Sequence, residues 1–204
     1  MKYILLLTIM AISNTAIATD SIYLKVHFLY GSKPKAAYKD TEPKWFGGKF
    51  GGHVGIEADS LQILNFIPTG KHHAFAKNKT PESAFVVHHP QSFYAILGGD
   101  GNNVKKAIFY IPITHTQKQL IDSISIAYLQ KSPYDYAIFG MRCGAAAYDI
   151  LAQLDILPAY SINKTYKKIF YPKKLRKRLF KLAKARNWLV HTEQGSDTRK
   201  WETK

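Results

Sequence analysis

The sequence predicts an α+β fold in which an antiparallel sheet packs against helices. Two observations support this prediction: segments of strand-like composition fill the first part of the chain, and apolar residues at helical spacing fill the second. The chain has 204 residues, of which 46% are hydrophobic. It is therefore long and apolar enough to form one domain with a substantial core.

The strand-like segments are rich in β-branched and aromatic residues and are separated by polar stretches. Two of them are close enough to form a hairpin that turns at Asp59-Ser60. Pro112 indicates a sheet edge or a strand end in the last segment, because proline has no N–H to donate. The predicted strands are 23–30, 53–57, 61–67, 84–88, 94–97 and 106–113, and the polar residues 31–52 form a long surface loop.

Three helices are predicted in the second part of the chain. The first follows Thr114 or Thr116, either of which can cap it. The second begins near Cys143 and ends before Pro158, and the third starts after Pro172. Because the helices follow the strands instead of alternating with them, we expect an α+β rather than an α/β arrangement.

The first 18 residues have the pattern of a secretory signal peptide. Lys2 precedes a short apolar run over 4–12, and Ala16-Ile17-Ala18 has the small residues of a cleavage site. We therefore expect a secreted or periplasmic protein whose mature chain begins near Thr19. The remainder divides into a domain over 19–160 and a basic helical extension over 161–204.

Positive charge is concentrated in that extension. The formal net charge is +15, and residues 164–186 contain eleven Lys or Arg and no Asp or Glu. Leu175, Leu179 and Leu182 form an apolar stripe among these charges, which predicts docking on an anionic membrane or cell-wall polymer. The alternative is that the leucines pack on the domain and the charges are solvated. A nucleic-acid partner is disfavoured by export and by the lack of an aromatic stacking module.

Cys143 is the only cysteine and therefore cannot form an internal disulfide. In the stretch FGMRCGAAAYDIL it opens a predicted helix. The helix dipole and the free backbone N–H groups at that position stabilise a thiolate and a developing oxyanion. These properties favour a nucleophile, and the alternative is a buried, inert thiol.

His53 is the candidate base, because it begins a strand that can aim its imidazole. A polar residue on the neighbouring strand would orient the ring through its second nitrogen. Asn65 fits if the hairpin loop has an odd length and sets it opposite His53. With an even loop, Gln62 or Glu57 would have to take that role.

Together these segments resemble the circularly permuted papain-like enzymes, the NlpC-type and lecithin-retinol-acyltransferase-like group. The stretch HVGIE resembles the histidine strand of that group, and TQKQLIDSISIAYLQKSPYDYAIFGMRC resembles its helix, tyrosine turn and nucleophile block. The resemblance covers roughly residues 23–157. It implies a permuted papain-like fold with Cys143 as nucleophile, His53 as base and Asn65 as third residue.

The resemblance also implies a substrate cleft. Tyr134 and Tyr136 are candidates to line it, with buried packing as the alternative. Arg142 stands where many members of the group have asparagine, and it could lower the thiol pKa, bind an anionic substrate group or replace a structural contact. The glycines of GGKFGG, residues 47–52, precede a strand instead of a helix. They are therefore expected to form an approach to His53 or a plain loop, and not a phosphate loop.

No cofactor or metal is expected. His72-His73 and His88-His89 are adjacent pairs whose side chains point in different directions, without a carboxylate at metal-binding spacing. The leading hypothesis is an exported thiol hydrolase or acyltransferase that cleaves an amide or ester bond of a cell-wall peptide or lipid. The alternative is a non-catalytic exported protein that binds anionic surfaces through its cationic helix.

Overall fold

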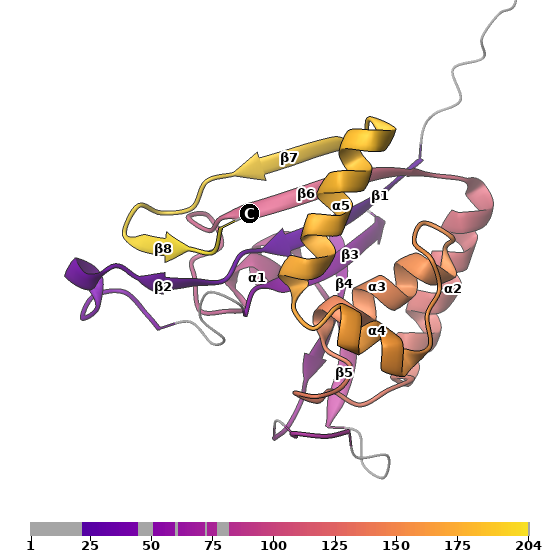
Figure 1. Ribbon diagram of the computed structural model, residues 1–204, viewed down its shortest axis with the longest axis horizontal. Coiled ribbons are helices and arrows are strands. Elements are labelled where there is room, and N and C mark those ends of the chain that lie inside the picture. Colours follow the sequence, from indigo (N-terminus) through magenta and orange to yellow (C-terminus); the bar gives the residue numbers. More distant parts are fainter. Residues whose placement is uncertain (1–21, 45–50, 60, 72, 77–81, 204) are drawn as a thin grey trace, which may run out of the picture.

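The structure is a computed structural model that describes residues 22–44, 51–59, 61–71, 73–76 and 82–203. Within these residues, six strands form one antiparallel sheet in the order β5-β4-β3-β1-β6-β7 (Figure 1). Their bounds are β1 Ile22–Leu29, β3 His53–Asp59, β4 Gln62–Pro68, β5 Ser83–His88, β6 Lys106–Ile113 and β7 Leu189–Glu193. The predicted signal peptide, residues 1–18, lies outside the described residues.

Two further strands and five α-helices complete the described fold. Strands β2 Ser32–Pro34 and β8 Arg199–Trp201 pair with each other, and a short 3-10 helix spans Ala36–Tyr38. The helices are α1 Pro90–Ala95, α2 His115–Gln130, α3 Cys143–Gln153, α4 Ile162–Lys168 and α5 Pro172–Arg186. The predicted α+β class, with an antiparallel sheet packed against helices, is confirmed.

The helices cover the two faces of the sheet unequally. Along β1, Leu24, Val26 and Phe28 are fully buried on the face that α2, α3 and α5 cover. On the opposite face, Leu29 packs with Phe93 of the short helix α1 in a smaller cluster. This division follows from the period of two in a strand, which sends successive side chains to opposite faces.

Local signals account for several element boundaries. Thr114 caps α2 by accepting a hydrogen bond from the Gln117 N–H, and the Gln117 side chain accepts from the Thr114 N–H in return. Pro112 lies beyond residues 106–110, the part of β6 that pairs with β7. The predicted helix cap and strand end are both present.

The prediction of a strand over 94–97 is wrong. Tyr94 and Ala95 instead end helix α1, which begins with Pro90 at its first position. Proline favours that position because its fixed φ suits a helix and its missing N–H would have no partner there. The packing of Phe93 against the sheet then outweighs the β propensity of the local residues.

The C-terminal segment is not only helical. Residues 161–204 contain α4 and α5, but they also contribute β7 to the main sheet and β8 to the small one. Leu175 and Leu179 of α5 are fully buried in the main core, against α3 and the sheet. The described part of this segment therefore belongs to the same packed core as residues 22–157.

Candidate active site

A cavity of about 750 Å³ lies at the end of the sheet where β3 begins and β4 ends. Its lining is mostly apolar and comes from both sides of the sheet. His53 and Cys143, which the sequence predicts as base and nucleophile, both line it. The other lining residues are Gly51, Gly52, Ile67, Pro68, Ile96, Leu97, Tyr136, Ile138, Arg142, Tyr171 and Pro172.

The glycines before His53 are required by a close approach of two chain segments. A Cβ on Gly52 would lie 2.5 Å from the Leu29 carbonyl oxygen at the end of β1. Gly51 and Gly52 thus let the chain enter β3 tightly against β1 while leaving one wall of the cavity open. The other glycines of the predicted approach, within 47–50, lie outside the described residues.

His53 donates from Nε2 to Oδ1 of Asn65 across 2.9 Å. Asn65 does not lie directly opposite His53, as the odd-loop prediction had it, because the β3–β4 register pairs Asn65 with Gly55. The two side chains share a face of the sheet as diagonal neighbours, and diagonal pairs on a sheet are within reach of polar side chains. The predicted orienting contact is present through a different register.

The contacts of Asn65 fix the tautomer of His53. The Asn65 Nδ2 donates to the carbonyl oxygens of Ile63 at 3.1 Å and Val86 at 3.2 Å, so the amide oxygen must face the histidine. An amide oxygen only accepts, and Nε2 of His53 therefore carries the proton. Nδ1 is left with a lone pair, as a base requires.

The environment of His53 keeps it neutral. Burial lowers its pKa to about 4, and the hydrogen bond that His53 donates to Asn65 opposes this only in part. Its ring packs against Phe93 of α1, with ring centroids 5.3 Å apart. Above pH 5 the imidazole is uncharged and can accept a proton.

The sequence reasoning missed His88 as a member of this cluster. Its Nδ1 lies 3.0 Å from Nδ2 of Asn65, so Asn65 links two histidines on one face of the sheet. Burial lowers the pKa of His88, and the neighbouring His53 lowers it further, because two adjacent imidazoles disfavour charge on both. The pairing of β4 with β5 places His88 there, and only the register of that pair could have revealed it.

Cys143 is the first residue of α3, as predicted, and Arg142 is its N-cap. The first hydrogen bond at this end of the helix runs from the Ala146 N–H to the Arg142 carbonyl. The N–H groups of Cys143 and Gly144 therefore lie before the helical ladder and can stabilise negative charge. A Cβ on Gly144 would lie 3.0 Å from the Pro172 nitrogen, so the glycine allows α5 to pack against this turn.

The thiol of Cys143 is protonated at rest. Its residue is only 5% exposed, and burial raises its pKa to about 11. Several groups oppose the effect of burial because they stabilise the thiolate. They are the charge of Arg142, the backbone N–H groups of Val54 and Gly144, and the Tyr136 hydroxyl. At neutral pH the site holds a thiol and a neutral imidazole, not an ion pair.

His53 and Cys143 approach the cavity from opposite faces of the sheet. Val54 points toward α3, and its N–H stabilises the sulfur, whereas the ring of His53 packs on the α1 side. Among the described contacts no hydrogen bond joins the two side chains. The two side chains lie on either side of the β3 backbone where this strand begins, and both line the cavity at that strand end.

The alternative orienting residues have other partners. Glu57 accepts from Lys25 Nζ at 2.6 Å and bonds His27 Nε2 at 2.8 Å. Burial would raise the pKa of Glu57, but these hydrogen bonds outweigh it and bring the pKa to about 2. Gln62 is exposed at the far end of the hairpin, opposite Asp59. Asn65 is the candidate that contacts His53.

The three predicted substrate-binding residues occupy different environments. Tyr136 lines the cavity beside Cys143, and burial raises its pKa strongly, so its hydroxyl remains a donor. Arg142 also lines the cavity, but its guanidinium stacks on Phe170 at 3.9 Å and donates to the Phe170 carbonyl. Tyr134 is not part of the lining and packs edge-to-face on Phe66 in the core.

The histidine pairs do not form a metal cluster in the described part of the chain, where no three His, Cys, Asp or Glu side chains are grouped to hold an ion. His73 instead pairs with Glu82 at 2.7 Å. His72 lies outside the described residues.

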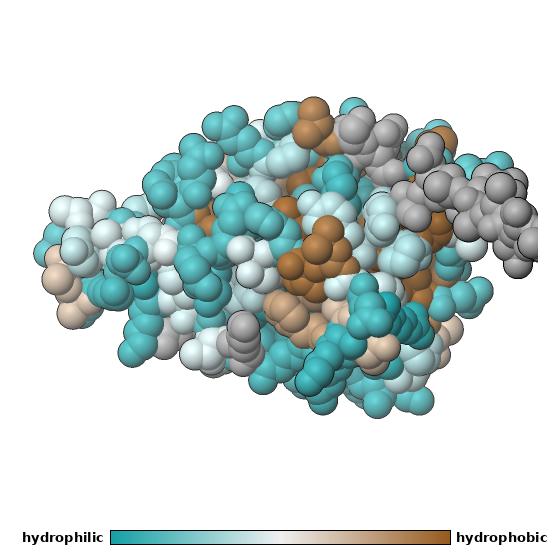
Figure 2. Space-filling model, turned by 90° about the horizontal axis from the view of Figure 1, so that it is seen from above, coloured by the Kyte–Doolittle hydropathy of each residue, from teal (hydrophilic) through white to brown (hydrophobic). Residues whose placement is uncertain are grey.

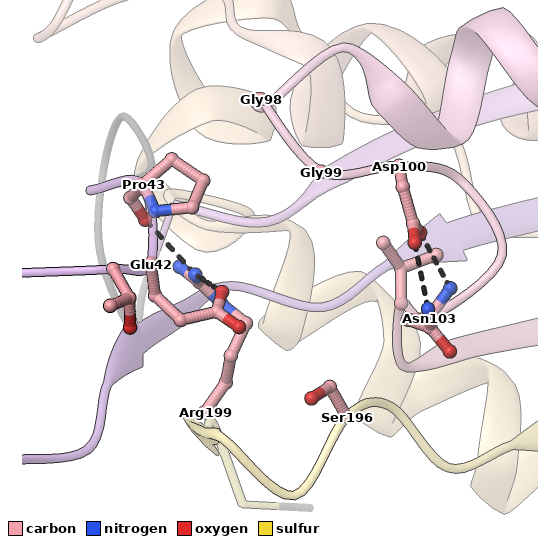
Figure 3. Close-up of a pocket in the computed structure, with 10 residues that line it drawn as sticks. Glu42, Pro43, Gly98, Gly99, Asp100, Asn103, Ser196 and Arg199 are labelled. Atoms are coloured by element: carbon pink, nitrogen blue, oxygen red, sulfur yellow. Dashed lines mark hydrogen bonds and ion pairs between the residues drawn. The ribbon is translucent and has the colours of Figure 1, made fainter. Parts of the chain in front are cut away.

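A second pocket of about 410 Å³ is polar (Figure 3). Glu42 accepts from Arg199 Nη1 at 2.8 Å, and Asp100 accepts from the backbone and side chain of Asn103. The Glu42–Arg199 pair joins the segment after β2 to β8, whereas the contacts of Asp100 with Asn103 lie within the loop before β6. The charged groups that Figure 3 shows are thus used in contacts within the chain.

Comparisons with protein-family models, with curated proteins and with solved structures found no match to this chain. The function is therefore inferred from the chemistry of the site.

Proposed function

We propose that this protein is an exported cysteine hydrolase or acyltransferase with a permuted papain-like arrangement. The observation that supports the proposal is the His53–Asn65 pair, which leaves Nδ1 unprotonated on a histidine that lines the same cavity as Cys143. The bond cleaved is an amide or an ester, from a cell-wall peptide or a lipid.

Catalysis would begin when the substrate carbonyl enters the cavity between the two groups. The Cys143 thiol gives its proton to His53 Nδ1, and the sulfur attacks the carbonyl carbon. The N–H of Cys143, at the start of α3, and the hydroxyl of Tyr136, next to the sulfur, would donate to the oxyanion. Protonated His53 then gives the proton to the leaving amine or alkoxide, and an acyl-thioester forms on Cys143.

The second half of the cycle releases the acyl group. His53 takes a proton from water or from an acceptor alcohol or amine, whose oxygen or nitrogen attacks the thioester carbonyl. The Cys143 sulfur leaves and recovers its proton from His53. Water as acceptor makes the protein a hydrolase, and any other acceptor makes it a transferase.

The test is acylation of Cys143 by p-nitrophenyl esters, measured by intact-mass spectrometry and p-nitrophenol release. The chain from Thr19, which contains every described element, should gain one acyl group at neutral pH. His53→Ala should reduce the acylation rate by on the order of 100-fold or more, because it removes the general base. Cys143→Ser should carry no thioester.

A matched control is His191→Ala, since His191 lies exposed on β7 away from the cavity. That variant should acylate like the parent chain. Equal acylation of the parent chain and His53→Ala would contradict the proposal, as would an acyl group found on residues other than Cys143.

A further inference from the structure

The mouth of the cavity carries an exposed aromatic surface. Phe75 and Phe139 are 69% and 54% exposed, and their ring centroids lie 5.6 Å apart. The segments that carry them are held side by side, because the N–H groups of Ile138 and Phe139 donate to the carbonyls of His73 and Ala74. We name Phe75, Phe139 and Ile138 the aromatic rim.

The aromatic rim is continuous with the cavity wall. The ring of Phe139 lies 6.3 Å from that of Phe170, which packs on Tyr171 at 4.7 Å. Tyr171 and Ile138 both line the cavity. An apolar path therefore leads from solvent at Phe75 to the walls around Cys143.

Exposed residues of this kind mark an interaction site. Ala74, Ala76 and Ile138 are exposed beside the two phenylalanines, so the rim is a contiguous apolar patch. The face of the molecule seen from above is mostly hydrophilic and also carries apolar patches (Figure 2).

Basic residues flank the rim on the side of Phe170. The stretch KKIFYPKK, residues 167–174, places four lysines around Phe170 and Tyr171. Lys167, Lys168 and Lys174 are exposed. This stretch contains no acidic residue, so the chain segment that carries Phe170 and Tyr171 is positively charged.

The same structure excludes the leucine stripe of α5 as the inserting group. Leu175 and Leu179 are fully buried against the domain, so they cannot enter a membrane while the fold is intact. The aromatic rim is exposed instead and lies next to the same basic segment.

We infer that the aromatic rim is a membrane-docking surface, which inserts into an anionic lipid bilayer and opens the cavity toward it. Apolar side chains partition into the interfacial region, and lysines beside them are attracted to anionic headgroups. Docking requires only the surface and not the reactivity of Cys143, so it goes beyond the proposed function. Among the described residues, no helix is long and apolar enough to span a bilayer.

The test is co-sedimentation of the chain from Thr19 with vesicles. Binding is expected to phosphatidylcholine vesicles that contain phosphatidylglycerol, with much weaker binding to phosphatidylcholine alone. Phe75→Ser with Phe139→Ser should weaken binding by about tenfold or more, since each ring contributes apolar area to the interface. The matched control is Ile126→Ser with Leu129→Ser, which removes two exposed apolar residues from α2.

The contribution of the lysines in residues 167–174 is tested separately. Lys167→Gln with Lys174→Gln should weaken binding to anionic vesicles about tenfold or more, and added salt should do the same. Lys33→Gln with Lys200→Gln is the control, because these exposed lysines face each other across β2 and β8.

Several outcomes would overturn the inference. Rim variants that bind like the parent chain would show that the lysines alone make the contact, as on a wall polymer. The parent chain could instead fail to bind vesicles and form dimers, and the rim variants could be monomeric. That result would assign the rim to self-association. Cys143→Ser should bind vesicles like the parent chain, so failure of catalysis and failure of docking are separate results.

Discussion

At the scale of single residues, the site depends on the hydrogen-bonding capacity of one amide. Asn65 can accept from His53 only because its donors are occupied by the carbonyls of Ile63 and Val86. A flipped amide would turn its NH2 group toward the His53 N–H and its oxygen toward the two carbonyl oxygens, so none of these hydrogen bonds could form. Asn65 therefore acts as a positioning residue that selects the tautomer of the base.

Replacing Asn65 should therefore affect catalysis more than stability. Asn65→Ala should lower the rate of Cys143 acylation by about tenfold to hundredfold, because the ring loses its orientation and tautomer. Asn65→Asp keeps an acceptor and should restore part of the rate, with the pH profile shifted upward because the carboxylate favours the imidazolium. Acylation rates across pH measure both effects. Equal rates for Asn65→Ala and the parent chain would rule out the positioning role.

The buried histidine predicts a pH dependence of stability. The pKa of His53 is about 4 in the folded chain and about 6.5 when unfolded, so the unfolded state binds the extra proton between these values. Folding stability should fall as pH drops from 6.5 to 4, by about 3 kcal/mol from this residue alone. Below pH 4 its contribution is constant.

Urea unfolding at pH 7 and pH 4.5 tests this effect. His53→Gln should lose less stability between the two pH values than the parent chain, because it has no imidazole to protonate. The pKa values of His27 and His88 are also lowered by burial, so both chains should retain some acid sensitivity. An identical loss in the two chains would contradict the neutral, buried state of His53.

At the scale of elements, α5 shows how a strongly basic helix can belong to a core. Leu175 and Leu179 recur at helical spacing and are buried, Leu182 is half-buried, and lysines between them such as Lys177 and Lys181 are exposed. Such a helix is stabilised by its apolar stripe, and its charges are free to act at the surface.

Two substitutions on α5 should distinguish its buried face from its exposed face. Leu179→Ala should reduce the free energy of unfolding by about 2–5 kcal/mol, because it leaves a cavity in the core. Lys177→Ala should change it by less than about 0.5 kcal/mol. Urea denaturation measures both. Similar small effects of the two substitutions would mean that α5 is not packed in solution as described.

At the scale of the whole molecule, the C-terminal segment completes the fold. Its strand β7 extends the main sheet, and Glu202 forms a buried ion pair with Arg176 of α5 at 2.6 Å. The Arg176 guanidinium also stacks on Tyr30 at 3.6 Å, beyond the end of β1. The end of the chain thus connects α5 to the strand at the centre of the sheet.

Removing one partner of the Arg176–Glu202 ion pair should destabilise the fold. Glu202→Ala leaves Arg176, only 1% exposed, without its carboxylate, and should destabilise the fold by about 3–5 kcal/mol. Arg176→Met combined with Glu202→Leu should recover much of that loss, because apolar side chains need no charged partner. Thermal or urea unfolding of the three chains measures the difference. A mild effect of Glu202→Ala would show that the C-terminal segment is not integrated as described.

Much of the fold could be predicted from local patterns. Strands β1, β3, β4, β5 and β6, the cap of α2 and the start of α3 at Cys143 are properties of neighbouring residues, which composition, periodicity and capping chemistry reveal. The candidate pair of His53 and Cys143 also follows from such patterns. The sequence patterns do not predict β7, β8 and α4, which are short, and they predict a strand where α1 ends. In these segments, packing against distant parts of the chain decides the secondary structure.

The sequence by itself determined which side chains are chemically able to act and on which elements they lie. Only the tertiary structure decided the strand register that joins Asn65 to His53, the burial that keeps His53 and Cys143 neutral, and the face that α5 turns inward. The physical reason is that register, desolvation and helix orientation depend on contacts between residues far apart in the chain, whereas periodicity and capping are local.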